Sequence, residues 1–379
     1  MNFQGFGVMH TFDNYFLCTF PQVQLRDIDH VVMDTMALID LYNFFEKSSS
    51  DQYVTPGVLD LLRNADLHVT TSAIERAWMH ETNSSKSIEH FLKPKGSVIA
   101  DTIEMLNFIK NCKAPEFALL KNEEFGIQDI PKIQEYRTKE SLAYGLDNIE
   151  FISTISQNWL GIATLMALEP MRPSSLNGDE DDEQARHLVL QQIDSYKSWQ
   201  TQLRAYGVGI STELRLMANL FFFGGYIDGI HGNKVRYEDL AKFNERRKHL
   251  KSRLARNIAF DFQHLTNARQ FRMGWLNNSV RVENRFSAIL TRDNILAAMV
   301  GNVFEEKRWT DQSKTKILGI EAPYKWPKES DFTKVFPENF AYEGFYGKSR
   351  SSHDLLEAID LVPILGKVLK DLDLPLEST

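Results

Sequence analysis

The segments Asp261-Phe-Gln-His264-Leu265-Thr-Asn-Ala268 and Ala288-Ile-Leu-Thr291-Arg292-Asp293 decide the fold of this chain. The first has the pattern of a helix with an acid on its inner face, and the second that of a short apolar strand ending in Thr-Arg-Asp. An earlier run, Val31-Val-Met-Asp34, ends in the same way, with an acid where a strand gives way to a helix. Because ligands of parallel sheets bind outside the carboxyl ends of the strands, these acids predict one metal-binding pocket assembled from distant segments.

The composition limits the class of protein. The chain has 379 residues, 43% of them hydrophobic, which allows two domains or one domain with a large insertion. A formal net charge of -8 argues against a globally basic nucleic-acid binder but leaves room for a local basic groove. Cys18 and Cys112 are too few for a disulfide framework or a cysteine-rich zinc site, and apolar runs such as 220–223 are far shorter than a membrane span. We therefore expect a soluble, cytoplasmic protein without a membrane partner.

The first eighty residues alternate short strands with helices. Residues 1–26 are expected to form an N-terminal arm or an edge strand. The apolar run 30–33 predicts a buried strand and 37–45 a helix, and a second helix over 57–64 begins after Thr55-Pro56. Residues 67–71 predict another strand, and Ser72 is expected to cap a helix that runs to Glu81. We assign 27–81 to the first part of an α/β core.

The rest of the chain is predicted to be largely helical before the core resumes. Residues 82–244 form a mainly helical insertion, which is too long for a normal connection and should fold as a subdomain that covers one side of the pocket. Residues 245–305 return to the core, and a continuous helix is predicted over 237–268. Before Asp261 this helix carries a basic cluster formed by Arg246, Arg247, Lys248, Lys251, Arg253 and Arg256. Residues 306–379 are a C-terminal extension, with an amphipathic helix over 353–370 that is kinked or split at Pro363.

The acids stand in segments that resemble a known family. Asp34-Thr35-Met-Ala37-Leu38-Ile39 is similar to the opening Asp-Thr-(Asn/Ser)-x-Leu-Ile of PIN domains. Residues 261–268 and 289–293 are similar to their closing Asp-Ala-x-His-x-x-x-Ala and Leu-Val-Thr-x-Asp elements. The resemblance covers 27–81 and 245–305, about a third of the chain, and implies a three-layer α/β/α core with a mostly parallel sheet. Most characterised members are Mg²⁺- or Mn²⁺-dependent ribonucleases that use three or four acids.

The resemblance implies four acids that serve as both catalytic and metal-binding residues. Glu75 is our choice for the second acid, because it lies in the first helical turn after the strand 67–71, where the family usually supplies a Glu. Asp60 and Glu81 are its rivals. The other three match the family motifs directly: Asp34 the first acid, Asp261 the third and Asp293 the fourth.

The chemistry of such a site follows from its ligands. Carboxylates suit Mg²⁺ and Mn²⁺ because hard cations prefer oxygen ligands, and crowded carboxylates repel one another without a cation. One or two bound ions would activate water and stabilise the leaving oxygen of a phosphodiester. The chain departs from the family pattern at Met36, at Phe262 and in its long insertion, and the insertion weakens inferences about the substrate more than those about the metal.

Hydroxyl and basic side chains extend the predicted site. Thr35 and Thr291 are expected to orient carboxylates or phosphate, and Arg292, Arg253 and Arg256 to hold the nucleic-acid backbone. Simpler interpretations stay open, because an Asp at a strand end is often a helix cap and a basic helix is often an ordinary solvated face. A lone His such as His264 is expected to pack or hydrogen-bond rather than to bind metal.

The sequence therefore predicts a metal-dependent nuclease, with RNA favoured over DNA, in a toxin, defence or RNA-processing role. A DNA nuclease with the same pocket is one alternative, since the same acids would serve both substrates. A catalytically inactive PIN-like binding or assembly module is another. A homo-oligomer or a regulatory partner protein is compatible with the sequence, because the helical insertion could serve substrate choice or self-assembly.

Overall fold

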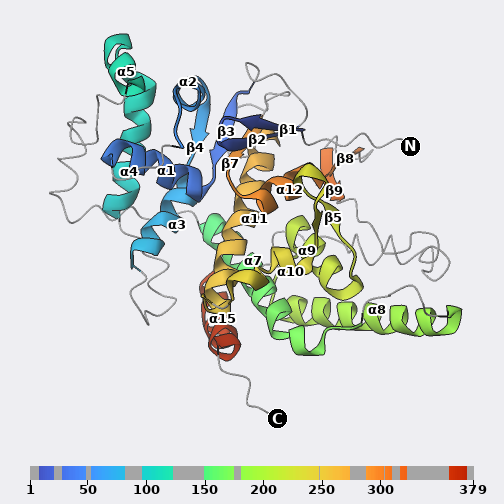
Figure 1. Ribbon diagram of the computed structural model, residues 1–379. Coiled ribbons are helices and arrows are strands. Elements are labelled where there is room, and N and C mark those ends of the chain that lie inside the picture. Colours follow the sequence, from blue (N-terminus) through green and yellow to red (C-terminus); the bar gives the residue numbers. More distant parts are fainter. Residues whose placement is uncertain are drawn as a thin grey trace. The chain divides into compact units, whose positions relative to one another are not determined.

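In a computed structural model of the chain, the described residues are 8–20, 28–47, 53–81, 96–122, 149–174, 181–246, 248–273, 287–302, 304–309, 316–321 and 358–373. They divide into two compact units. Figure 1 labels their helices and strands. The first unit contains Met1–Asp147 and Gln263–Gly301, and the second contains Asn148–Phe262 and Asn302–Thr379. Within the described ranges, no helix is both long enough and apolar enough to cross a membrane.

A five-stranded mixed sheet organises the first unit. Its strands are β1 Val8–Phe12, β2 Tyr15–Phe20, β3 His30–Met33, β4 Asp66–His68 and β7 Ser287–Thr291. They lie in the order β1-β2-β7-β3-β4, and β3 pairs in parallel with both β7 and β4. A hairpin of β1 and β2 joins the other side of β7 in antiparallel orientation. The predicted α/β class is confirmed, but the sheet is mixed because the N-terminal arm contributes this hairpin.

Both faces of the central strands are covered. Every residue of β3 and β7 is buried, as expected for strands with structure packed on both sides. On one face, Val31 and Met33 of β3 and Ala288 and Leu290 of β7 share a core with four helices. These helices are α1 Thr35–Glu46, α2 Pro56–Asn64, α4 Gly96–Asn111 and α5 Ala114–Lys121. The first part of the predicted insertion, α4 and α5, therefore belongs to the core unit.

The junction after β4 differs from the sequence prediction. β4 ends at His68, and α3 already begins at Thr70 and runs to Glu81. Ser72, the predicted cap, lies inside this helix, and its Oγ donates a hydrogen bond to Met33 O at 2.6 Å. Ser72 thereby satisfies the last carbonyl of β3 and fastens α3 to the central strand.

The second unit is mainly helical. Its long helices are α7 Ile149–Ala167, α8 Asp182–Ala205, α9 Thr212–Phe223 and α15 Ala358–Asp373, and α15 packs against α7. The C-terminal extension thus shares a unit with most of the insertion, and α15 is not split at Pro363. The side chains 221–223 at the end of α9 are all buried in the core. Shorter elements are η4 Glu169–Met171, β5 Ile227–Asp228, η5 Ile230–Gly232, β6 Lys234–Val235, β8 Phe304–Trp309 and β9 Lys316–Glu321.

The predicted continuous helix over 237–268 is wrong. The segment forms α10 Tyr237–Leu240, the short 3₁₀ turn η6 Phe243–Glu245 and α11 Lys251–Met273. Lys242 has a φ of 51°, a left-handed conformation that a right-handed helix does not contain. The basic residues before Asp261 therefore do not share one helix.

Candidate functional site

Asp34 stands at the carboxyl end of β3, where the chain turns into α1. Its backbone N–H continues the pairing with β7 by donating to Leu290 O at 3.0 Å. Its side chain is only 5% exposed, and Oδ1 accepts a hydrogen bond from Met36 N at 3.4 Å as the cap of α1. The structure thus places a buried acid at the predicted edge of the sheet.

The last residue of β7 connects two of the predicted acids. Thr291 Oγ1 donates to Asp34 Oδ2 at 2.7 Å and accepts from the Asp293 backbone N–H at 2.9 Å. Asp293 precedes α12 Asn294–Asn302, and its Oδ1 accepts from the N–H groups of Ile295 at 2.6 Å and Leu296 at 3.1 Å. Because β3 and β7 are parallel neighbours, one hydroxyl brings Asp34 and Asp293 together.

Glu75 reaches the same edge from α3. The residue is buried, 6% exposed, and its carboxylate accepts a hydrogen bond from Oγ1 of Thr35, the residue after Asp34. Its rival Asp60 lies on α2 with a side chain that is 49% exposed and paired with Lys121 Nζ at 2.6 Å. The side chain of the other rival, Glu81, lies outside the described part of the chain. Of the candidates whose side chains are described, Glu75 is the one beside Asp34.

Asp261 belongs to the second unit. α11 begins in that unit and ends in the first, and Asp261 precedes the boundary at Gln263. Its Oδ2 forms an ion pair with Lys242 Nζ at 3.1 Å. The structure therefore groups three of the four predicted acids and pairs the fourth with a lysine of the second unit.

A buried histidine adjoins Asp34. His264 is fully buried on α11, with Nε2 4.0 Å from Asp34 Oδ1, which is too long for a hydrogen bond. Neither ring nitrogen has a hydrogen-bond partner among the described residues. Burial, and to a smaller extent the neighbouring His68, lowers the pKa of His264 to about 3. The imidazole is therefore neutral at pH 7 and does not neutralise the acids.

Asn267 links the same region of α11 to α3. Its Nδ2 donates to Thr71 Oγ1 at 2.6 Å and lies 3.0 Å from His68 Nε2, and its Oδ1 accepts from Gln263 Nε2 at 2.9 Å. Burial, with a smaller effect of His30, lowers the pKa of His68 to about 4. Sequence reasoning missed this cluster, because no local pattern connects Asn267 with a threonine 196 positions away.

Arg292 was expected to contact a nucleic-acid backbone, but its guanidinium is engaged inside the first unit. Nε lies 2.7 Å from Asp40 Oδ2, and Nη2 donates to Asp40 Oδ1 at 2.8 Å. The Tyr53 ring lies on the guanidinium, 3.7 Å from Cζ to the ring centroid. Sequence reasoning gave Asp40 no role, although an acid on the buried side of an amphipathic helix needs a partner.

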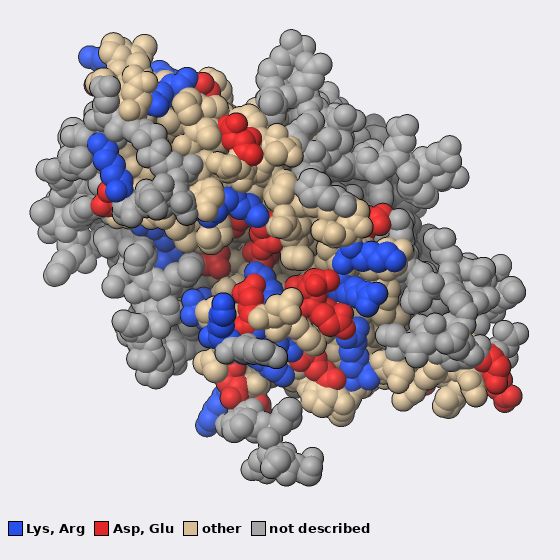
Figure 2. All heavy atoms as spheres, in the orientation of Figure 1, with Lys and Arg blue, Asp and Glu red and all other residues tan. Residues whose placement is uncertain are grey.

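The predicted phosphate track is not continuous. Arg253 is exposed, whereas Arg256 is 3% exposed and donates to Asn257 Oδ1 from Nη2 at 3.1 Å. Arg247, another member of the basic cluster, lies outside the described residues. On the face shown in Figure 2, basic and acidic side chains are interspersed, so what is described there presents no uniformly positive surface to phosphate.

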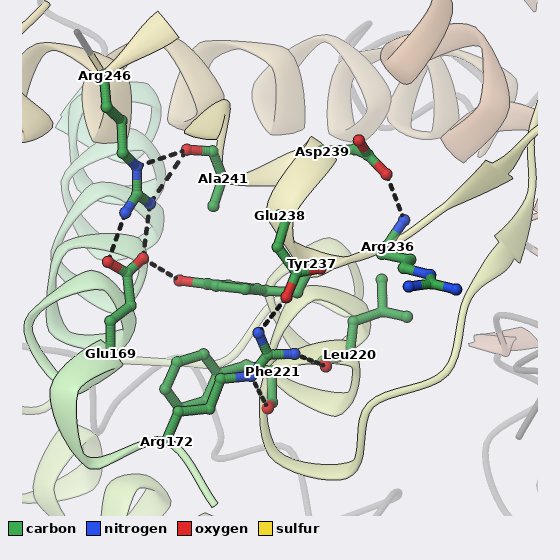
Figure 3. A network of polar contacts seen from close by, with 10 residues as sticks. All are labelled: Glu169, Arg172, Leu220, Phe221, Arg236, Tyr237, Glu238, Asp239, Ala241 and Arg246. Atoms are coloured by element: carbon green, nitrogen blue, oxygen red, sulfur yellow. Dashed lines mark hydrogen bonds and ion pairs between the residues drawn. The ribbon is translucent and has the colours of Figure 1, made fainter. Parts of the chain in front are cut away.

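Arg246 belongs to an ion-pair network of the second unit (Figure 3). Its Nη2 donates to Glu169 Oε1 at 2.6 Å, and Tyr237 Oη donates to the same oxygen at 2.8 Å. Arg172 pairs with Glu238 and donates to two carbonyls at the end of α9. The network fastens η4, α9, α10 and η6 together, and we assign it a structural role.

The donor chemistry suits a hard cation, but the described side chains do not form a cage for one. Within the described ranges, no three His, Cys, Asp or Glu residues are grouped so that they could hold a metal ion. Mg²⁺ is usually bound by one or two carboxylates together with waters and substrate phosphates, not by an all-protein cage. Asp34 together with Glu75 or Asp293 is compatible with such partial ligation.

Comparison with family models, curated proteins and solved structures finds no match to this chain. The function therefore has to be inferred from the chain's own geometry. Three acids and two threonine hydroxyls lie at the carboxyl edge of β3 and β7.

Proposed function

We propose that this chain is a metal-dependent nuclease that hydrolyses phosphodiester bonds, with RNA as the favoured substrate. The observation that carries the proposal is the pair Asp34 and Asp293, which follow neighbouring parallel strands and share the hydroxyl of Thr291. Glu75 supports it, because Thr35 holds its carboxylate at the same edge. A three-layer PIN-like core is part of the proposal, and the coverage of β3 and β7 on both faces favours it.

In this proposal Asp34, together with Glu75 or Asp293, would bind Mg²⁺ or Mn²⁺, and waters and substrate phosphate would complete the coordination. When bound, the cation supplies a water of lowered pKa and stabilises the leaving oxygen. Thr35 and Thr291 hold the carboxylates of Glu75 and Asp34, so that less side-chain freedom is lost when a phosphate arrives.

A neutral imidazole adjoins the proposed site. His264 is fully buried with Nε2 4.0 Å from Asp34 Oδ1, and because its pKa is lowered to about 3 it adds no positive charge beside that carboxylate. In the second unit, considered separately, Arg253 is exposed and Arg256 is buried, so a phosphate contact from that part of α11 would come from Arg253.

A catalytically inactive binding or assembly module is the second candidate. It is favoured by the observation that Asp34 caps α1 and Asp293 caps α12. Helix capping alone would account for the presence of both acids. In that case Asn would replace either residue without loss of function, since Asn is an equally good cap.

The deciding experiment is a cleavage assay with the purified protein in Mn²⁺, in Mg²⁺ and in EDTA. Single-stranded RNA, single-stranded DNA and duplex DNA of one sequence are the substrates. We expect metal-dependent cleavage of RNA that Asp34→Asn and Asp293→Asn abolish, because the charge is lost while the helix cap is kept. Preferential cleavage of DNA would instead support the DNA nuclease.

Asp181→Asn is the matched control. Asp181 caps α8 in the second unit, where its Oδ1 accepts from two backbone N–H groups, as that of Asp293 does. Cleavage should be unchanged in this variant. Full activity in Asp34→Asn and Asp293→Asn would remove both acids from the site, and a wild-type protein that cleaves none of the substrates would favour the binding module.

A further inference from the structure

Arg292 lies between Thr291 and Asp293 in the chain, but its side chain contacts Asp40 and not these two neighbours. Its Nη2 donates a hydrogen bond to Asp40 Oδ1 at 2.8 Å, and Nε lies 2.7 Å from Asp40 Oδ2 in an ion pair that lacks hydrogen-bond geometry. A charge-assisted hydrogen bond combined with an ion pair restrains the guanidinium. The backbone turn at 291–293 is therefore held by the side chain of its own central residue.

The partner of Arg292 is itself immobilised. The Asp40 side chain is 5% exposed, and Tyr15 Oη, from β2, donates to its Oδ2 at 2.9 Å. Burial raises the pKa of Asp40, and the bond from Tyr15 and the charge of Arg292 oppose that rise. The ring of Tyr53 adds a cation–π contact to the guanidinium. Only 23% of the Arg292 side chain is exposed, so these contacts leave it little reach toward a phosphate.

We propose that Asp40 and Arg292 are positioning residues, whose paired side chains fix the turn 291–293 so that Thr291 and Asp293 stay beside Asp34. Both hydrogen bonds of the Thr291 hydroxyl depend on where this turn lies. The catalytic consequence rests on the nuclease proposed above, whereas the positioning itself rests on the contacts alone.

Positioning is tested by amide hydrogen exchange, which needs no nuclease activity. In Arg292→Lys and Asp40→Asn, exchange at Asp293, Ile295 and Leu296 should be about five- to thirtyfold faster than in the wild type, because the hydrogen bond and the ion pair that hold the turn are weakened. Amides of β3 should keep their wild-type rates, which separates a local effect from global unfolding. Unchanged exchange at the turn would overturn the proposal.

Arg63→Lys is the matched control for this measurement. The Arg63 guanidinium also lies on an aromatic ring of the first unit, 4.1 Å from the centroid of Phe117, and donates to Cys112 O. These contacts are remote in sequence from 291–293, and exchange at the turn should not change. Tyr53→Leu, which removes only the stacked ring, replaces Asp40→Asn if that variant does not fold, and a smaller increase in exchange is expected from it.

Steady-state kinetics then distinguish positioning from substrate binding. Arg292→Lys and Asp40→Asn should lower kcat about 100-fold with little change in KM for RNA, as expected when reacting groups are misplaced. A phosphate-binding Arg292 would instead raise KM and flatten the salt dependence of binding, and this result would overturn the proposal. If the wild type cleaves nothing, the proposed function fails, and the exchange rates still decide whether Asp40 and Arg292 hold the turn.

Discussion

Thr291 and Asp34 are 257 positions apart in the chain, and the hydroxyl of the first donates to the carboxylate of the second at 2.7 Å. The bond forms because β3 and β7 pair in parallel with Met33 opposite Leu290, which places the next residues, Asp34 and Thr291, at one edge of the sheet. The same hydroxyl accepts the backbone N–H of Asp293. A single side chain therefore links the carboxylate of Asp34 to the backbone of Asp293.

Replacement of Thr291 by Val should destabilise the protein. Val has nearly the same shape, but it leaves the buried Asp34 carboxylate without one donor and the Asp293 N–H without its acceptor. We expect the free energy of unfolding to fall by about 1–3 kcal/mol, measured by urea denaturation. Thr291→Ser retains the hydroxyl, so its free energy of unfolding should fall by less. Equal decreases in the two variants would show that the hydroxyl contributes nothing to stability.

Acidification below pH 6.5 should destabilise the fold through His68 and His264. Each is protonated in the unfolded chain below its ordinary pKa of 6.5, but burial lowers the folded-state pKa of His68 to about 4 and that of His264 to about 3. Between these values the unfolded chain binds more protons, so the free energy of unfolding falls as the pH falls. The slope should be about 1.4 kcal/mol per pH unit for each histidine, measured by denaturation from pH 7 to pH 4.

A variant series isolates the histidine contribution from that of the carboxylates. His264→Gln should reduce the slope of the unfolding free energy against pH by the contribution of one histidine. This holds whatever the substitution does to stability at pH 7. His187→Gln, at an exposed position on α8, is the control and should leave the slope unchanged. A wild-type slope in His264→Gln would mean that this imidazole is not kept neutral by folding.

Gly161→Ala should destabilise the second unit. Gly161 lies where α7 meets α9, and an added Cβ would come within 2.3 Å of Leu214 Cδ2. Overpacking of this kind costs about 1–3 kcal/mol, which a urea titration would resolve. The double variant with Leu214→Ala should be more stable than the sum of the two single losses predicts, because the smaller side chain makes room. Additive losses would show that the two residues are not in contact.

Glu169→Gln should also destabilise the second unit. The Glu169 side chain is 12% exposed, and its carboxylate pairs with Arg246 and with Lys251 and accepts from Tyr237. Loss of the charge leaves two partly buried cations without their partner, which costs roughly 3 kcal/mol. Tyr237→Phe removes one hydrogen bond and keeps the ion pairs, so its loss in unfolding free energy should be smaller. A larger loss of unfolding free energy in Tyr237→Phe than in Glu169→Gln would show that the ion pairs contribute little to stability.

The sequence alone determined the features that depend on neighbouring residues. The α/β class followed from short apolar runs between helical patterns, and the strand at 30–33 ends as expected at Asp34. Thr55 and Pro56 marked the start of α2, where Thr55 Oγ1 does accept from Val58 N. Caps and periodicity act within a few residues, and such signals can be read from local sequence.

Only the tertiary structure decided which distant groups meet. It added an antiparallel hairpin to β7, broke the helix at Lys242, and bound Arg292 to Asp40, although the local pattern pointed to a parallel sheet, a continuous helix and a phosphate contact. Local propensities differ by less than about 1 kcal/mol per residue, so the pairing of strand edges and the burial of charged groups outweigh them. These terms depend on residues far apart in the chain, and no local pattern records them.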